Sequence, residues 1–93
     1  MDIDPRCKEL EKDMPIKILI GDQCDINLYQ DIPDLDIIVD DGGHTMIQQN
    51  TTFNFLFPRL KPGGVYLCED THTSYWAPWG GGLRKIRHVY RKF

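Results

Sequence analysis

The sequence predicts one small α/β domain, or part of a larger one, built on a mostly parallel sheet. Short apolar runs without alternation, rich in β-branched residues, recur along the 93 residues and suit strands that are covered on both faces. Segments with helical spacing separate these runs, which is the order typical of parallel βαβ units. The pattern allows about four strands, and a chain this short buries a smaller share of its surface than a typical domain.

The N-terminal third is expected to hold two strands and two short helices. Asp4 can cap the first helix, with Pro5 at the first helical position, where its missing N–H costs nothing. Met14 ends that helix because the residue before a proline disfavours helical conformation. The expected elements are a strand stub at 1–4, a helix at 5–12, a strand at 16–20 and a helical turn at 26–30.

The rest of the chain continues the alternation. Thr45 and Gln48 fit a capping box at the start of the longest helix, and Pro58 is expected to loosen its last turn. Apolar residues spaced i, i+3, i+4, i+7 give that helix one apolar face. The expected elements are a strand at 35–39, a helix at 45–60, a turn at 61–64, a strand at 65–68 and a loop. The core is expected over 1–79 and a basic C-terminal tail over 80–93.

Composition and charge exclude several function classes. The formal charge of −3 gives no reason to expect a nucleic acid or an anionic membrane as partner. No apolar run approaches the roughly 20 residues that span a bilayer, and no signal-peptide pattern opens the chain. Cys7, Cys24 and Cys68 are odd in number and widely spaced, which indicates reduced thiols in a cytoplasmic protein.

Every expected strand ends in a polar cluster. The carboxyl ends of parallel strands share one edge of a sheet, with neighbouring strands roughly 4.8 Å apart, so these clusters are expected to line one rim. Acidic groups at such short distances repel one another unless a cation or a hydroxyl-rich ligand lies among them. The clusters are Asp2 and Asp4, Asp22 and Gln23, Asp40 with Asp41 and His44, and Glu69 with Asp70.

The stretch LDIIVDDGGH gives the clearest candidate site. If its strand pairs with the next one, Asp41 can converge with Glu69 and Asp70, and three carboxylates suit Mg²⁺ better than zinc. His44 can then act as general base on a hydroxyl that the metal has made more acidic. In the alternative interpretation, Asp40 and Asp41 only cap the following helix, and the acidic pair after the next strand faces water.

Five segments of the chain resemble, in order and spacing, the second half of class I S-adenosylmethionine-dependent methyltransferases. They are DIDPRCKELE, GDQCD, DLDIIVDDGGH, LFPRLKPGGVYLCED and THTSYW. The branch that looks nearest holds the macrolide sugar O-methyltransferases of the mycinamicin and tylosin pathways, with related cephalosporin-hydroxylase-type proteins. LKPGG is common to many methyltransferases, whereas DDGGH followed by a strand that ends in ED is much more specific. The branch more often carries Ser where this chain has Gly43.

The resemblance implies a Rossmann-like sheet with flanking helices, and it assigns roles to single residues. It implies S-adenosylmethionine and Mg²⁺ as cofactors, and a hydroxyl of a natural-product sugar or a similar small molecule as acceptor. His44 would deprotonate that hydroxyl, and Asp40 would orient the turn or contact the cofactor. The other roles fall to Asp2 at the ribose hydroxyls, Asp22 and Gln23 beside the adenine, and Asp41, Glu69 and Asp70 around Mg²⁺.

The departures from the family pattern predict an incomplete sheet. The family's first strand and its glycine-rich turn are absent before Met1, and its last strands are absent after Trp79. That first strand would lie between the strands that end at Asp2 and Asp40. We therefore expect a fragment of a methyltransferase that is inactive by itself. Since a sheet without its central strand has unpaired backbone groups, we expect a new pairing or a homo-oligomer to cover the gap.

Two further functions stay open from the sequence. One is a non-catalytic fold remnant that self-associates through unpaired sheet edges, and the other is a metal-dependent hydrolase that activates a water at the same carboxylates. Trp76 and Trp79, near a run of glycines, can form a lid over the acceptor or pack at an interface. His72 fits a solvent-facing loop histidine better than a support for the site. The basic run at 84–92 fits a solvated helix face better than a phosphate site.

Overall fold

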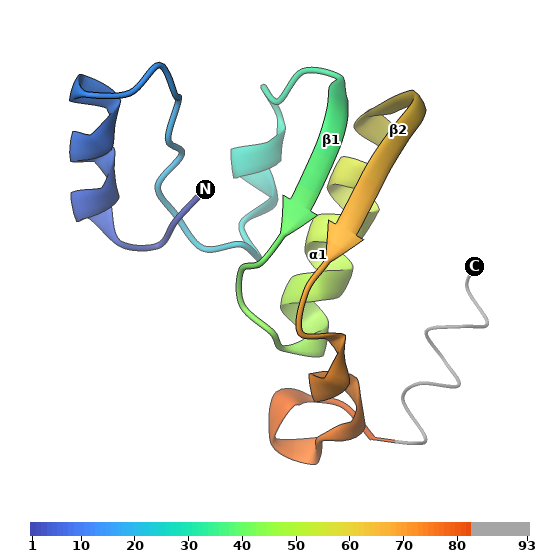
Figure 1. The fold of residues 1–93 in the computed structure, drawn as a ribbon. Helices are drawn as coiled ribbons and strands as arrows, with labels where there is room; N and C mark the ends of the chain where they lie inside the picture. The colour runs from blue at the N-terminus through green and yellow to red at the C-terminus, as the bar shows by residue number, and fades with distance from the viewer. Residues whose placement is uncertain (83–93) are drawn as a thin grey trace.

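The computed structural model describes residues 1–82 and confirms the α/β class, as a partial Rossmann-like fold (Figure 1). Within this range β1 and β2 form a two-stranded parallel sheet, and one α-helix connects them. The basic tail predicted from the sequence falls mainly on 83–93, outside the described residues. The elements are 3-10 helix η1 (Pro5–Lys12), 3-10 helix η2 (Ile26–Tyr29), β1 (Leu35–Asp40), α1 (Met46–Leu56), 3-10 helix η3 (Phe57–Arg59), β2 (Leu60–Cys68), 3-10 helix η4 (Thr71–Tyr75) and 3-10 helix η5 (Ala77–Trp79).

The second strand is longer than the sequence predicts. The expected turn at 61–64 belongs to β2, which pairs with β1 from Leu35↔Leu60 to Asp40↔Cys68 with an irregularity after the first pair. Gly64 explains how the strand passes this point, because a Cβ there would lie 2.8 Å from the Asp36 carbonyl oxygen. Residues 61–64 have no register partner in β1, where Asp36 alone lies opposite them, and Gly63 is left-handed with φ 82°. The expected turn is therefore present as an irregularity within β2, and glycine permits the close approach at Gly64.

The capping box predicted at the start of α1 is confirmed. Thr45 Oγ1 accepts from the Gln48 N–H at 3.4 Å, and the Gln48 side chain accepts from the Thr45 N–H at 3.2 Å. The helix ends at Leu56, and the chain continues as η3 around Pro58, which confirms the loosened last turn. This fixed start matters for the site, because the loop that leads into Thr45 carries the candidate residues.

The core lies between α1 and one face of the sheet. Tyr29, Ile38 and Leu56 are buried there. Figure 1 shows α1 behind the two strands, while η1 and the segment after it lie on the β1 side of the sheet, away from β2. No described helix of residues 1–82 is long and apolar enough to cross a membrane.

The other face of the sheet is open, and the prediction of strands covered on both faces is wrong for this chain. Its side chains alternate with the covered ones and are about half exposed or more, because α1 lies on the other side of the strands (Figure 1). They pair in register across the two strands. The members of this open face, with their exposed fractions, are Ile37 (66%), Val39 (57%), Val65 (48%) and Leu67 (51%).

The two strands expected at 1–4 and 16–20 shrink to a single parallel bridge between Asp2 and Ile20. Ile18 shows why the second strand fails. Its N–H donates to Glu11 Oε1 at 2.5 Å, and its carbonyl oxygen accepts from Lys8 Nζ at 2.6 Å. Side chains of η1 thus take the backbone groups that a neighbouring strand would need. The sheet of the described residues therefore has two strands and not about four.

Candidate functional site

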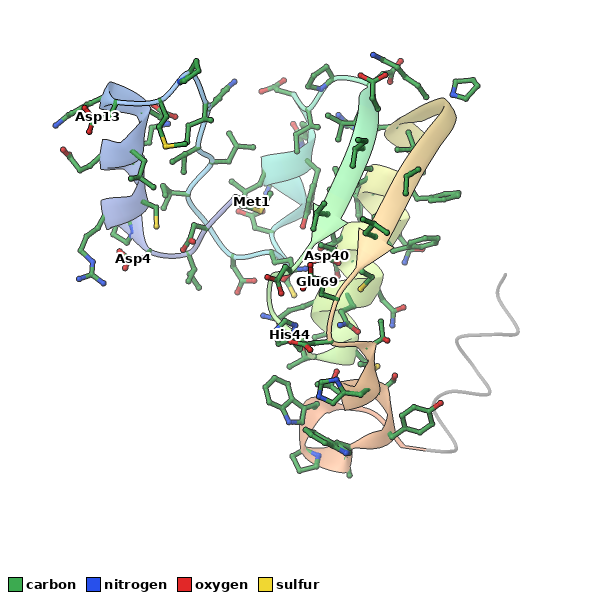
Figure 2. The ribbon with its side chains drawn as sticks, in the orientation of Figure 1. Met1, Asp4, Asp13, Asp40, His44 and Glu69 are labelled. Carbon is green, nitrogen blue, oxygen red and sulfur yellow. The ribbon has the colours of Figure 1, made fainter. Side chains whose placement is uncertain are left out.

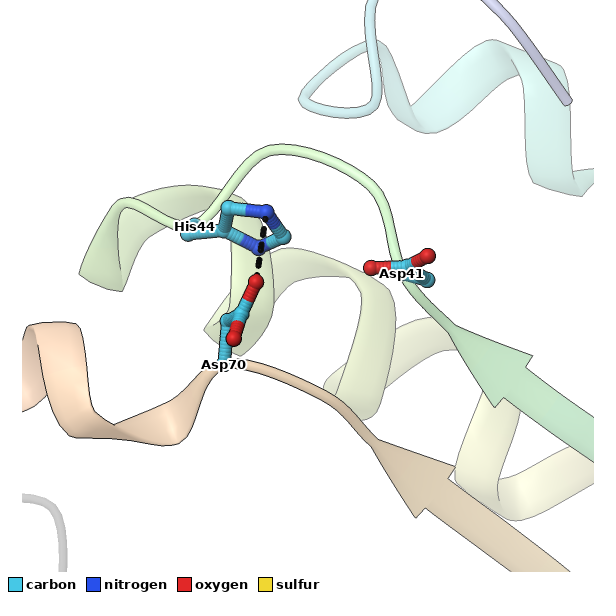
Figure 3. A group of neighbouring side chains, drawn as sticks. All are labelled: Asp41, His44 and Asp70. Atoms are coloured by element: carbon cyan, nitrogen blue, oxygen red, sulfur yellow. Dashed lines mark ion pairs between the residues drawn. The ribbon is translucent and has the colours of Figure 1, made fainter.

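Asp41, His44 and Asp70 come together where β1 and β2 end. Each offers one ligand atom, and these atoms lie within 4.8 Å of one another (Figure 3). His44 Nε2 is 3.3 Å from Asp70 Oδ2. The parallel ladder continues one step beyond the strands, because the Glu69 N–H donates to the Asp40 carbonyl oxygen at 2.9 Å. The alignment of the two strands therefore determines which side chains meet.

Asp70 occupies a constrained position in this group. Its backbone is left-handed, with φ 51° and ψ 37°, and it is the single non-glycine residue of 1–82 with positive φ. Such a conformation persists only where the surroundings hold it in place. Its two carboxylate oxygens contact different imidazoles, since His72 Nδ1 lies 3.7 Å from Oδ1 and His44 contacts Oδ2. Asp70 is thus turned toward the group by its backbone.

Thr73 joins the two loops of the site, and sequence reasoning missed it. Its buried hydroxyl donates to the His44 carbonyl oxygen at 2.6 Å and lies 3.1 Å from the Asp70 carbonyl oxygen. One side chain therefore contacts the backbone of the loop that carries His44 and the backbone of the turn that carries Asp70. A threonine three residues after a strand-end acid is a common turn residue, so little in the local pattern points to this link.

Glu69 lies at the same strand end, near Asp40, as Figure 2 shows. Its carboxylate is not among the grouped ligand atoms of the described residues, while its backbone carbonyl accepts from Gln49 Nε2 at 3.2 Å. The structure therefore brings together two of the three carboxylates predicted for the metal, with His44 as the third member. The ligand role of Glu69 stays a prediction.

Asp40 is a buried carboxylate with a complete set of partners. It is 6% exposed, its Oδ1 accepts from Gln23 Nε2 at 2.9 Å, and its Oδ2 accepts from the Tyr66 hydroxyl at 3.0 Å. Burial, and secondly the adjacent carboxylate, raise the pKa of Tyr66, so the phenol stays a neutral donor. Of the two roles predicted for Asp40, these bonds fit the one that orients the turn.

The residues predicted to contact the cofactor line one open pocket of about 660 Å³. The pocket lies between the N-terminal residues, the segment after Ile20 and the loop that follows β1. The Asp4 N–H donates to Asp2 Oδ1 at 2.8 Å and lowers the pKa of Asp2, which therefore carries its charge at neutral pH. The residues of this pocket that are predicted to contact the cofactor are Asp2, Asp22, Gln23 and Asp40. Asp41 of the metal group lines the pocket as well.

Two tryptophans stand beside the acidic group. The Trp79 ring centroid is 6.2 Å from that of His44, and the Trp76 ring meets His72 edge-on at 4.9 Å. The predicted loop is in fact two short helical turns, η4 and η5, whose end is closed by backbone bonds from Gly81 to Trp76 and from Gly82 to Ser74. The tryptophans are half exposed, so both predicted roles, acceptor contact and interface packing, stay predictions.

Comparison with known proteins confirms the resemblance to natural-product sugar O-methyltransferases. The chain is 37% identical over 83 residues to the 8-demethyl-8-alpha-L-rhamnosyl tetracenomycin-C 2'-O-methyltransferase of Streptomyces olivaceus, a match that covers 85% of this chain and 22% of that protein. It is 35% identical to the demethylmacrocin O-methyltransferase of Streptomyces fradiae, and this match covers 85% of this chain and 21% of that protein. The chain matches no protein-family profile.

A solved structure gives the same relationship in three dimensions. The MycE methyltransferase of the mycinamycin biosynthetic pathway, in complex with Mg, SAH and mycinamycin VI, superposes with a TM-score of 0.63 at 38% identity. The match covers 69% of this chain and 19% of MycE. The chain thus spans about a fifth of the length of the relatives it matches.

Proposed function

We propose, from this similarity to sugar O-methyltransferases, that the chain forms part of an S-adenosylmethionine- and Mg²⁺-dependent O-methyltransferase. Its acceptor is a hydroxyl of a natural-product sugar or a similar small molecule. One observation supports this most directly: Asp41, His44 and Asp70 meet at the strand ends, beside a pocket lined by acidic residues. The three cysteines, all without a disulfide, fit a reduced cytoplasmic setting.

The donor atoms at the strand ends fit Mg²⁺. Asp41 and Asp70 are exposed and supply carboxylate oxygens from two separate loops, while solvent can supply the water ligands that Mg²⁺ usually keeps. The predicted third carboxylate, Glu69, lies next to Asp70 in the chain. No cysteine joins the grouped atoms of the described residues, and the single imidazole does not make a zinc set.

The pocket fits the nucleoside part of S-adenosylmethionine. Asp2 is ionised, exposed and placed on its wall, so its carboxylate can accept hydrogen bonds from ribose hydroxyls. Asp22 lies on the same wall, with one oxygen occupied by the Cys24 N–H at 2.7 Å.

His44 is the proposed general base. When bound, Mg²⁺ would make the acceptor hydroxyl more acidic, and S-adenosylmethionine would supply the methyl group. Asp70 Oδ2 lies 3.3 Å from His44 Nε2, so an Nε2–H can donate to it and leave Nδ1 free to take the hydroxyl proton. The same carboxylate stabilises the imidazolium that forms. Positioning and proton removal are the two tasks that methyl transfer to a hydroxyl requires of a protein.

The open face supports self-association as part of the proposal. Four aliphatic side chains, paired in register, remain half exposed on a small protein, which is typical of a surface that another molecule covers. We assign a second copy of the chain to this face.

Calorimetry with the chain tests the proposed function. Titration with S-adenosylhomocysteine, with and without Mg²⁺, is expected to give weak binding at most, because the chain carries only part of the family's cofactor pocket. Asp2→Asn is expected to reduce this binding further, and Asp70→Asn is expected to spare it in the absence of metal. Metal binding without nucleoside binding would favour the hydrolase. Absence of both would favour the fold remnant. In a longer relative, His44→Ala at the matching position is expected to abolish turnover while binding persists, and retained turnover would remove histidine from the base role.

A further inference from the structure

Gln23 makes side-chain hydrogen bonds to three separate parts of the molecule. Its Nε2 donates to Asp40 Oδ1 at 2.9 Å and to Thr52 Oγ1 at 2.6 Å, and its Oε1 accepts from the Gly43 N–H at 2.7 Å. These partners belong to the end of β1, to α1 and to the loop after β1. Both N–H groups of the amide are therefore engaged, and one side chain joins a strand, a helix and a loop.

The backbone of Gln23 is itself held by the core. The Tyr29 hydroxyl donates to the Gln23 carbonyl oxygen at 2.5 Å and lies 3.2 Å from Thr52 Oγ1. Tyr29 is 1% exposed and Thr52 is 5% exposed, so neither partner can move without disturbing the core. Gln23 is thus fixed at both ends, as a supporting residue must be.

The loop that carries the candidate residues packs directly on this amide. A Cβ at Gly42 would lie 2.5 Å from Gln23 Oε1, and the next N–H along the chain, that of Gly43, bonds to the same atom. Asp41 comes before these two glycines and His44 comes after them. Because two consecutive glycines have wide conformational freedom, a single fixed acceptor between them determines where both side chains are presented.

We propose that Gln23 is the positioning residue of the group formed by Asp41, His44 and Asp70. The inference rests on the proposed function for the purpose of that group, and it gives Gln23 a task other than a contact with adenine. Gln23 holds the loop from the β1 side, while Thr73 holds it from the side of η4. Loss of the amide frees the glycine pair, and Asp41 and His44 then leave their places opposite Asp70.

Gln23→Met tests this assignment, because methionine keeps the side-chain volume and removes the hydrogen bonds. Mn²⁺ serves as the probe, followed by the paramagnetic broadening of assigned amide signals of the full chain. Gln23→Met is expected to weaken Mn²⁺ binding about tenfold, as is common when a group that orients metal ligands is lost. Amide hydrogen exchange is expected to show lost protection at Gly43.

Thr52→Val is the matched control. It removes one of the three partners of Gln23 and lowers the melting temperature, yet it leaves the bonds to Asp40 and Gly43. We expect Mn²⁺ affinity within about twofold of wild type and a protected Gly43 amide. The assignment is overturned if Gln23→Met keeps both properties, or if Thr52→Val loses them equally. If the wild-type chain does not bind Mn²⁺, the proposed function fails. Hydrogen exchange at the Gly43 amide then still tests whether Gln23 holds the loop.

Discussion

The two faces of the β1–β2 sheet come from the same strands and yet contrast sharply. The covered face carries Asp40 and Tyr66, polar groups that lie under α1 and bond to each other. The open face carries four aliphatic side chains, and these are between 48% and 66% exposed. The covered face thus buries the polar Asp40 beside the apolar Ile38, while the open face exposes four aliphatic side chains, which is unusual for a protein surface.

The difference separates two tasks of the molecule. The covered face is continuous with the site, because Asp40 connects through Gln23 to the loop of His44. The side chains of Ile37, Val65 and Leu67 have no such connection among the described residues and do not line the pocket. We therefore expect that damage to the covered face changes the fold and the site, whereas damage to the open face changes association.

The largest effect is expected for Ile38→Ala on the covered face. Ile38 is 5% exposed and belongs to the core with Tyr29 and Leu56, so its truncation leaves a cavity and lowers the free energy of unfolding by about 3 kcal/mol. The adjacent Ile37→Ala is the matched control, because it removes the same atoms from a side chain that is 66% exposed. Urea denaturation of dilute protein is expected to show a loss below about 1 kcal/mol for this control. Equal losses would abolish the distinction between the faces.

Tyr66→Phe is expected to have the next largest effect. It removes the donor to Asp40 Oδ2, a hydrogen bond to a charged group, and lowers the free energy of unfolding by about 1.5 kcal/mol. Burial raises the pKa of Tyr66 above its value in the unfolded chain. The stability that this group contributes is therefore complete below about pH 10 and declines as the pH rises above that value.

The pH dependence of unfolding separates this effect from simple loss of packing. Denaturation curves between pH 8 and 11 (about the window set by the ordinary tyrosine pKa) are expected to fall less steeply for Tyr66→Phe than for wild type. Some slope persists in the variant, because burial also raises the pKa of Tyr29. Tyr75→Phe, at an exposed tyrosine, is expected to keep the wild-type profile. Parallel curves for Tyr66→Phe and wild type would contradict a buried phenol beside Asp40.

Local features of the fold could be predicted from the sequence, and features that depend on distant side chains could not. The capping box at Thr45 involves residues three apart, and the order of strand and turn at Asp41 follows from one apolar run. The strand at 16–20 failed because Glu11 and Lys8 bond to Ile18, a contact that no periodicity records. Its apolar run predicts a full neighbouring strand, whereas within 1–82 the segment pairs through the bridge between Asp2 and Ile20.

The same limit applies to the candidate site. His44 and the carboxylates could be found because strand ends of parallel strands meet at one edge. The role of Gln23 in supporting the site could not be predicted, because its hydrogen-bond partners lie 17 to 29 positions away in the sequence. Thr52 carried a weak signal, as a polar residue on the helix face that packs against the sheet.

The smallest effect on stability, and the sharpest on assembly, is expected for Leu67→Lys on the open face. Leu67 belongs to the aliphatic patch and pairs with Val39, so a charge there opposes burial against a second copy. Sedimentation velocity is expected to show self-association of wild type and a monomeric variant, with unfolding free energies of the dilute proteins within about 0.5 kcal/mol. Asn54→Lys, on an exposed position of α1, adds the same charge elsewhere and should still associate. A monomeric wild type would instead mean that a different molecule covers this face.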